Sequence, residues 1–243
     1  MKQYVYVAVA GILLSLFSCK DHCIKGDGNV MNNASRYFNY FDIIQSNINA
    51  DVYITYVNDT LPDEVFVRCD GNLDPYIHTS VDKSNNTLYI ELDNEHCIRP
   101  SRPIEVYVYA HRITGIISNS SGKMICDSIV SSNLSIQVLG NGGIYMTGIS
   151  IDLITGNLVG NGTIEIEGKG INGTYVNWAG GRFTAAQMML SGNCSATCKG
   201  TGGMSVYCKN ILTADPGPNG AVITFYGNPH TVIAPQERVV PGN

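Results

Sequence analysis

Two glutamates, Glu165 and Glu167, are the residues of this chain best suited by type and spacing to acid–base chemistry. They alternate with apolar residues, so in an extended strand their side chains point the same way, about 6.6 Å apart. Two carboxylates about 5–9 Å apart can serve as the acid and base of a polysaccharide-cleaving site. An exposed strand also produces this spacing by alternation alone, and the neighbouring repeats carry no second acidic pair. A polysaccharide-acting enzyme, a lyase or hydrolase, therefore remains the alternative function.

Three aromatic residues, Tyr145, Tyr207 and Phe225, are expected on the outward side of the strands. Rings at such positions can stack on sugars or anchor a protein partner. Scattered exposed aromatics are also ordinary on protein surfaces, so both interpretations stay open. The sequence contains no Ser-His-Asp arrangement and no glycine-rich loop leading into a helix that would bind phosphate. We expect no cofactor.

One disulfide is suggested by the positions of Cys69 and Cys97, which each follow an apolar strand-like segment. Neighbouring strand ends would bring these two sulfur atoms together in an oxidising compartment. The pair is our candidate bridge.

Cysteines in the C-terminal half are expected to be buried thiols. Cys194 and Cys198 lie four residues apart, about 13 Å in a strand, which is too far for a bridge between them. A bridge between Cys198 and Cys208 stays open. Cys126, Cys194 and Cys198 fall on inward positions, where cysteine behaves as a small hydrophobe. The spacing of these cysteines and of the scattered histidines does not predict a metal site.

The charge of the chain argues against nucleic acid as a partner. The formal net charge is −5 and only 14% of the residues are charged. Nucleic-acid binding uses clustered Lys and Arg on one face, whereas the basic residues here fall singly on different repeats. We expect no nucleic-acid partner.

The N-terminus combines the features of an export signal. Residues 1–18 carry one lysine and an apolar stretch that turns polar at once after Cys19. Leu-Phe-Ser-Cys resembles the lipobox of bacterial lipoproteins, which implies that Cys19 is lipidated and that residues 19–25 form a tether to the outer membrane of a Gram-negative cell. Asp21 loosely resembles surface-export signals and favours display outside the cell. Periplasmic and surface-exposed locations both stay open.

Glycines recur about every 20 residues in the C-terminal half, each followed by alternating apolar positions. A fixed period near 20 residues with period-two alternation predicts stacked coils of an all-β solenoid, with parallel pairing of successive copies. We predict a single domain over 26–243, with irregular coils over 26–110 and regular repeats over 111–230. The marker glycines are Gly122, Gly142, Gly162, Gly181, Gly202 and Gly220.

Several local features follow from this repeat. The Asn-Gly pairs suit corners with positive φ, and residues 48–55 mirror residues 139–146 as an early copy of the unit. Residues 74–77 predict a short helical turn, and residues 231–236 are expected to cover the last coil. The predicted inward side chains are Met124, Ile144, Ile164, Phe183, Met204 and Val222.

Two tripeptides resemble a bacterial O-glycosylation signal. They are Asp59-Thr60-Leu61 and Asp127-Ser128-Ile129. The resemblance makes Thr60 and Ser128 candidate acceptor residues.

Spaced short motifs along most of the chain resemble those of one family. They are Gly26-Asp27-Gly28-Asn29-Val30, Phe41-Asp42-Ile43-Ile44, Asp51-Val52-Tyr53-Ile54, Asp70-Gly71-Asn72-Leu73, the Gly-Asn-Gly repeats and Tyr226-Gly227-Asn228-Pro229. Together they look like the putative auto-transporter adhesin head GIN domain. The resemblance implies a right-handed parallel β-helix on a lipid-anchored envelope protein, and it carries no catalytic residues. We therefore expect a non-catalytic adhesin or scaffold that binds glycan or an envelope or host protein.

Overall fold

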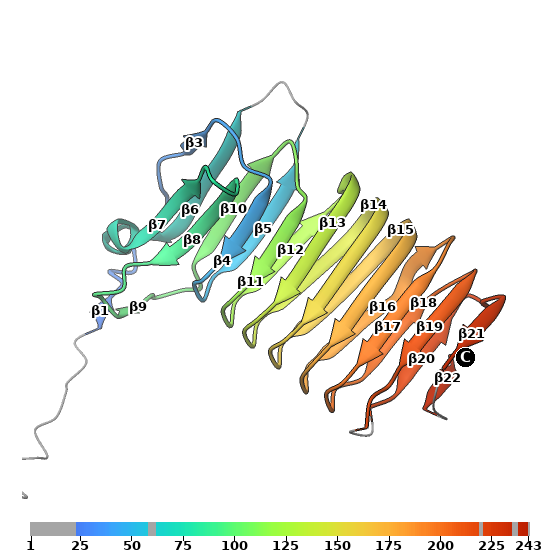
Figure 1. The fold of residues 1–243 in the computed structure, drawn as a ribbon. Coiled ribbons are helices and arrows are strands. Elements are labelled where there is room, and N and C mark those ends of the chain that lie inside the picture. Colours follow the sequence, from blue (N-terminus) through green and yellow to red (C-terminus); the bar gives the residue numbers. More distant parts are fainter. Residues whose placement is uncertain (1–22, 58–61, 219–220, 235–237, 243) are drawn as a thin grey trace, which may run out of the picture.

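The computed structural model describes residues 23–57, 62–218, 221–234 and 238–242, and it is nearly all β-strand (Figure 1). The chain forms a β-solenoid of about six turns with parallel stacked coils, as the repeats predict. The short 3₁₀ helix η1 (Gly71–Tyr76) confirms the predicted turn at 74–77. The strands of the regular part are β11 (Gly115–Ser118), β12 (Lys123–Asp127), β13 (Val130–Val138), β14 (Gly143–Leu158), β15 (Thr163–Asn177), β16 (Arg182–Leu190), β17 (Cys194–Cys198), β18 (Met204–Tyr207), β19 (Ile211–Asp215), β20 (Ile223–Tyr226), β21 (Thr231–Ile233) and β22 (Val239–Pro241).

A row of apolar side chains, one from each coil, fills the interior of the rod. Ile144 pairs in register with Met124 on one side and with Ile164 on the other. Phe183 and Met204 continue the row on the next two coils. All five are buried, as predicted. A single coil could not bury such a row, so the coils depend on one another for their core.

The last position of this row was predicted wrongly. Val222 is 42% exposed, and the buried neighbour Ile223 pairs with Met204 instead. The corner before β20 contains Pro216 and Pro218 with Gly217 at φ 59°. The first inward residue of β20 lies three positions after the marker glycine, whereas it lies two positions after that glycine in the earlier coils. Because side chains alternate along a strand, this shift exchanges its inward and outward faces.

The marker glycines provide room rather than unusual backbone angles. The prediction of positive φ at the Asn-Gly corners is wrong for Asn141-Gly142 and for Asn161-Gly162, whereas Asn219-Gly220 lies outside the described residues. A Cβ atom on Gly142 would overlap the carbonyl oxygen of Gly122, and one on Gly202 would overlap that of Gly181. Successive backbones therefore touch at this corner, and a side chain would separate the coils.

The N-terminal end of the rod is built by chain that folds back over an early coil. Its strands are β1 (Ile24–Lys25), β2 (Val30–Asn32), β3 (Arg36–Phe38), β4 (Ile43–Ser46), β5 (Asp51–Tyr56), β6 (Asp63–Asp70), β7 (Ile77–Asp82), β8 (Thr87–Leu92), β9 (Ile98–Arg99) and β10 (Glu105–Ala110). β4 and β5 stack in parallel on β11 and β12. The intervening excursion then places β8 against β4 and β10 against β5, while β6 closes this end antiparallel to β10 (Figure 1).

The early copy of the repeat lies one residue away from its predicted register. Val52 pairs with Met124, and Tyr53 pairs with Ile125, which in turn pairs with Tyr145. The predicted match of 48–55 to 139–146 would have placed Val52 opposite Gly143. With the observed register, Tyr53 points outward in line with Tyr145, which matters for the surface described below.

The candidate bridge between Cys69 and Cys97 is not formed. Cys97 is bonded to Cys23, with Cα atoms 4.4 Å apart, and Cys69 is a buried free thiol in β6. Cys69 points into the core, where its Sγ lies 3.3 Å from the amide nitrogen of Asn33. Cys97 instead precedes β9, which pairs in parallel with β1 directly after Cys23. The disulfide therefore ties the N-terminal segment to the body.

The remaining cysteines agree with the prediction of buried thiols. Cys126, Cys194, Cys198 and Cys208 are all free and buried, so the Cys198–Cys208 bridge left open above is absent. Burial raises the pKa of Cys126 to about 12. These thiols are packing residues and stay protonated at neutral pH.

The C-terminal tail extends the solenoid as a further partial coil. β21 pairs in parallel with β19, and β22 pairs in parallel with β20. This agrees with the expectation that residues 231–236 cover the last coil, although 235–237 lie outside the described residues. Within the described part of the chain, no helix is long and apolar enough to cross a membrane.

A buried carboxylate fastens the N-terminal segment from a second side. Asp70 is 1% exposed and accepts hydrogen bonds from the backbone N–H of Gly28 and of Ser101, each at 2.8 Å, and from the Ser101 hydroxyl at 2.6 Å. Burial raises the pKa of this carboxyl, but the hydrogen bonds outweigh it and the pKa of Asp70 is lowered. The charged form is therefore the one that the fold stabilises.

Replacing Gly202 with alanine should lower the free energy of unfolding by about 3 kcal/mol, because the new Cβ must push apart two stacked backbones. Gly203→Ala is the matched control, since a Cβ there meets no atom within 4 Å. Urea denaturation followed by circular dichroism measures both. Equal stability of the two variants would contradict the role assigned to the glycine corner.

Asp70→Asn should lower the free energy of unfolding by about 2 kcal/mol at pH 7, because a neutral amide is a poorer acceptor for three donors. Since the pKa of folded Asp70 lies below its ordinary value of 3.8, the carboxylate stabilises the protein above that pH and loses its contribution as the pH falls through the folded pKa. The stability difference between the two proteins should therefore shrink at pH 3. A difference that stays constant from pH 7 to pH 3 would count against this account.

Candidate functional site

The three predicted ligand-facing aromatics do not form one surface. Tyr145 is half-buried and points outward on β14, as predicted. Tyr207 also points outward, on β18, where it pairs with Tyr226 near the C-terminal end. Phe225 was predicted wrongly: it pairs with the buried Val206 and packs against the core, because of the one-residue shift before β20.

Outward aromatics from neighbouring strands instead gather near the N-terminal end. Phe66 of β6, Tyr107 of β10 and Tyr53 of β5 are register partners, and we call these three rings the aromatic row. The ring centroids are 4.7 Å apart for Phe66 and Tyr107 and 5.1 Å apart for Tyr107 and Tyr53, with the planes nearly parallel. Ile125 and then Tyr145 continue the same line along the rod.

Sequence reasoning missed this row, although a signal for it exists. Three segments share an acidic residue, valine, an aromatic residue and a branched apolar residue: Asp51-Val52-Tyr53-Ile54, Glu64-Val65-Phe66-Val67 and Glu105-Val106-Tyr107-Val108. In a strand, this order buries the aliphatic side chains and exposes the aromatic one. The pairing of these strands with one another is not encoded in the glycine repeat.

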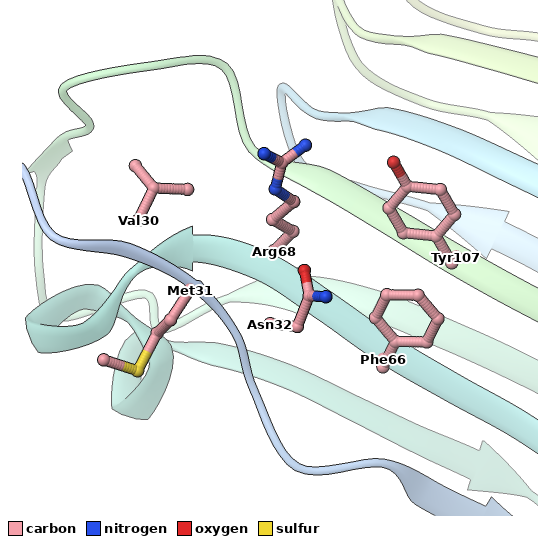
Figure 2. Close-up of a pocket in the computed structure, with 6 residues that line it drawn as sticks. All are labelled: Val30, Met31, Asn32, Phe66, Arg68 and Tyr107. Carbon is pink, nitrogen blue, oxygen red and sulfur yellow. The ribbon is translucent and has the colours of Figure 1, made fainter.

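A hollow of about 480 Å³ opens at the Phe66 end of the row, and we call it the β2 hollow (Figure 2). Phe66 and Tyr107 lie on one side of it and Val30 and Met31 on the other, with Arg68 and Asn32 between them (Figure 2). The full lining is Val30, Met31, Asn32, Phe66, Arg68 and Tyr107. The hollow thus combines an aromatic wall with an amide and a guanidinium that can give directed hydrogen bonds.

Glu105 organises the polar groups of the β2 hollow. One of its carboxylate oxygens accepts hydrogen bonds from Arg68 Nη1 at 3.0 Å and from the Tyr107 hydroxyl at 2.9 Å. Burial and then the bond to Glu105 raise the pKa of Tyr107, so its hydroxyl remains a donor. The bond to Glu105 likewise raises the pKa of Arg68. A second hollow of about 90 Å³ adjoins and is lined by Val30, Arg68, Arg102, Pro103 and Glu105.

The two glutamates with suitable spacing for catalysis share a separate hollow. Glu165 and Glu167 are exposed and line a space of about 290 Å³ together with Tyr145, Thr184 and Gln187. Both carboxylates come from one face of one strand. A cleaving site would need them on opposite sides of the bond to be broken. This arrangement gives hydrogen-bond acceptors beside an aromatic ring more readily than an acid and a base.

Other predicted positions lie apart from these hollows. Ser128 is exposed at a bend with φ 63°, while Thr60 and Cys19 lie outside the described residues. Among the residues that the structure describes, no group of three or more His, Cys, Asp or Glu side chains could hold a metal ion.

Comparison with known proteins identifies the family of this chain. A family model described as putative auto-transporter adhesin, head GIN domain, matches residues 40–229. The chain belongs to this GIN domain family. The match includes all three strands of the aromatic row and the regular coils as far as β20. No curated protein matches the sequence.

Solved structures share the fold of this GIN domain. A putative adhesin from Bacteroides fragilis superposes with a TM-score of 0.79 at 17% identity, covering 90% of this chain and 98% of that one. A putative adhesin from Parabacteroides distasonis gives a TM-score of 0.64 at 18% identity, with 90% and 98% coverage. A putative lipid binding protein from Parabacteroides distasonis gives 0.63 at 17% identity, with 90% and 99% coverage.

Proposed function

We propose that this GIN domain protein is a lipid-anchored, non-catalytic binding protein of the cell envelope that holds a glycan at the β2 hollow and along the line toward Tyr145. The observation that carries the proposal is a half-buried, outward-facing aromatic ring, Phe66, beside a guanidinium and an amide in one hollow. A sugar ring has an apolar C–H face and a polar rim, so it can contact both kinds of group at once. The adhesin description of the family and of two similar folds agrees with a binding role.

The rigidity of the surface supports the same function. The aromatic row stands on hydrogen-bonded strands rather than on loops, and β2 is paired antiparallel with β6. A preformed surface loses little conformational entropy when a ligand binds. The lipid-binding description of one similar fold belongs to that protein and suggests a second ligand class for testing.

Anchoring through Cys19 would hold this surface near the membrane. Cys23 lies four positions after Cys19, a reach of at most about 14 Å, and Cys23 is bonded to the body. A lipid on Cys19 would therefore hold the rod to the membrane through a short tether. In this arrangement the N-terminal end faces the membrane and the repeats extend away from it.

A polysaccharide-acting enzyme is the alternative, and Glu165 and Glu167 beside Tyr145 are its candidate residues. Their common strand face argues against opposed acid and base roles. Binding without cleavage is the simpler use of these oxygens.

A glycan array probed with residues 20–243 tests the proposal; this form retains Cys23 for its disulfide. We expect retention of intact glycan, with binding weakened about tenfold by Phe66→Ala and by Tyr145→Ala, each of which removes a ring from the line. Tyr207→Ala is the control, because Tyr207 points outward far along the rod. Thermal melts confirm that the variants fold.

Mass spectrometry of the array spots separates the two functions. Cleaved glycan that becomes intact in Glu165→Gln would establish the enzyme. Absence of binding to every glycan on the array would contradict glycan binding and favour a protein or lipid ligand.

Lipidation is tested separately by metabolic labelling of the full chain with an alkyne fatty acid. We expect label on the wild-type protein and none on Cys19→Ser, because the lipid is attached at that residue. Cys126→Ser is the control, since this thiol is buried. Wild-type protein that is exported without label would overturn the anchor.

A further inference from the structure

We propose that the β2 hollow recognises an anionic sugar, one that bears a carboxylate or sulfate group, with Arg68 and Arg102 as the groups that bind the anion. This inference rests on the proposed glycan binding and names the class of glycan. It starts from the charges on the two adjoining hollows, which share Val30 and Arg68.

Arg102 lacks a carboxylate partner at these hollows. Among the described residues, Glu105 is the one carboxylate that lines them, and it already accepts hydrogen bonds from Arg68 and Tyr107. Arg102 is exposed and forms no ion pair with any carboxylate of the described residues. A second carboxylate, Asp70, lies next to the site but is buried and already accepts three hydrogen bonds from Gly28 and Ser101. The exposed guanidinium of Arg102 is therefore the group that is open to an anionic ligand.

The positive charge continues onto the neighbouring two-stranded ribbon. Lys25 of β1 and Arg99 of β9 are register partners, so two cations stand side by side, and neither pairs with a carboxylate of the described residues. Asp27 follows β1, where its side chain accepts the backbone N–H of Asn29. Like charges held side by side repel, and a bound anion would relieve that repulsion.

The apolar and charged parts of the hollow lie in the order that an acidic sugar requires. Phe66 supplies the apolar wall and Met31 an apolar contact on the opposite side, Asn32 between them supplies an amide for hydroxyl groups, and Arg68 borders both hollows with Arg102 beyond it. A guanidinium matches the two oxygens of a carboxylate with two parallel hydrogen bonds. A pyranose ring on Phe66 could thus direct its acidic substituent between the two arginines.

Asp70 holds the two backbone segments that border this site. It holds the backbone of Gly28, two residues before Val30, and the backbone of Ser101, the residue before Arg102. The antiparallel pair of Asn32 with Arg68 fixes the floor between them. The hydrogen bonds at Asp70 therefore have a use beyond stability, since they set the distance between the apolar wall and Arg102.

The test compares acidic oligosaccharides with their neutralised forms on the chain of residues 20–243. The probes are an oligogalacturonate with its full methyl ester and a chondroitin sulfate oligosaccharide with its desulfated, carboxyl-reduced form. We expect at least one acidic probe to bind about tenfold more tightly than its neutral counterpart, with affinity falling as salt rises from 50 to 300 mM. Arg102→Ala should weaken binding about tenfold, and Arg102→Glu should abolish it.

Arg182→Glu is the matched control, because Arg182 is an exposed cation on β16, away from both hollows. Melting temperatures verify that the charge reversals fold. Equal binding of acidic and neutral probes, binding of neutral probes alone, or unchanged binding by Arg102→Glu would overturn the inference and leave glycan binding intact. If none of the acidic and neutral glycans bound, both this inference and the proposed glycan binding would be overturned.

Discussion

Parallel hydrogen bonding between backbones of successive coils is the constraint on which the rest of the structure depends. The coils approach so closely at the marker glycines that a side chain cannot fit between them. This fixed spacing holds one residue of each coil above its equivalent in the next, so apolar residues line up inside and other residues line up outside. The interior row stabilises the rod. The exterior rows follow from the same register, and they form the outward surface of the regular coils, including Tyr145.

The N-terminal end departs from the simple repeat and carries the most varied surface. Its excursion adds strands β6 to β10 outside the coil formed by β4 and β5, which places three aromatic strands side by side. The disulfide between Cys23 and Cys97 and the hydrogen bonds to Asp70 then hold the incoming segment over this sheet. Without that segment there would be an aromatic row but no β2 hollow. The contacts that close this end of the rod therefore also build the candidate site.

The sequence predicts those parts of the structure that depend on local spacing. Glycines about 20 residues apart and alternating apolar residues were sufficient for the solenoid and for the inward positions from Met124 to Met204. Contacts across the excursion were not predictable in this way, because the partner of Cys97 depends on where β1 returns. Strand register was the other feature that the sequence predicted poorly. A shift of one residue turned Phe225 inward and left Tyr53 out of the predicted surface, since neighbouring side chains in a strand face opposite ways.

Stacking within the aromatic row decides which of its rings can meet a ligand. Tyr107 lies between Phe66 and Tyr53 with nearly parallel planes, so both of its faces are covered by protein. Its hydroxyl instead donates a hydrogen bond to Glu105, which also accepts one from Arg68. Tyr107 is therefore a positioning residue that holds the guanidinium through a shared carboxylate. Phe66 ends the row, with Tyr109 also near its ring at 6.1 Å, and borders the β2 hollow together with the Asn32 amide and Arg68 (Figure 2), while Arg102 lines the adjoining hollow. We therefore expect the proposed glycan contacts at this end of the row rather than spread evenly over its rings.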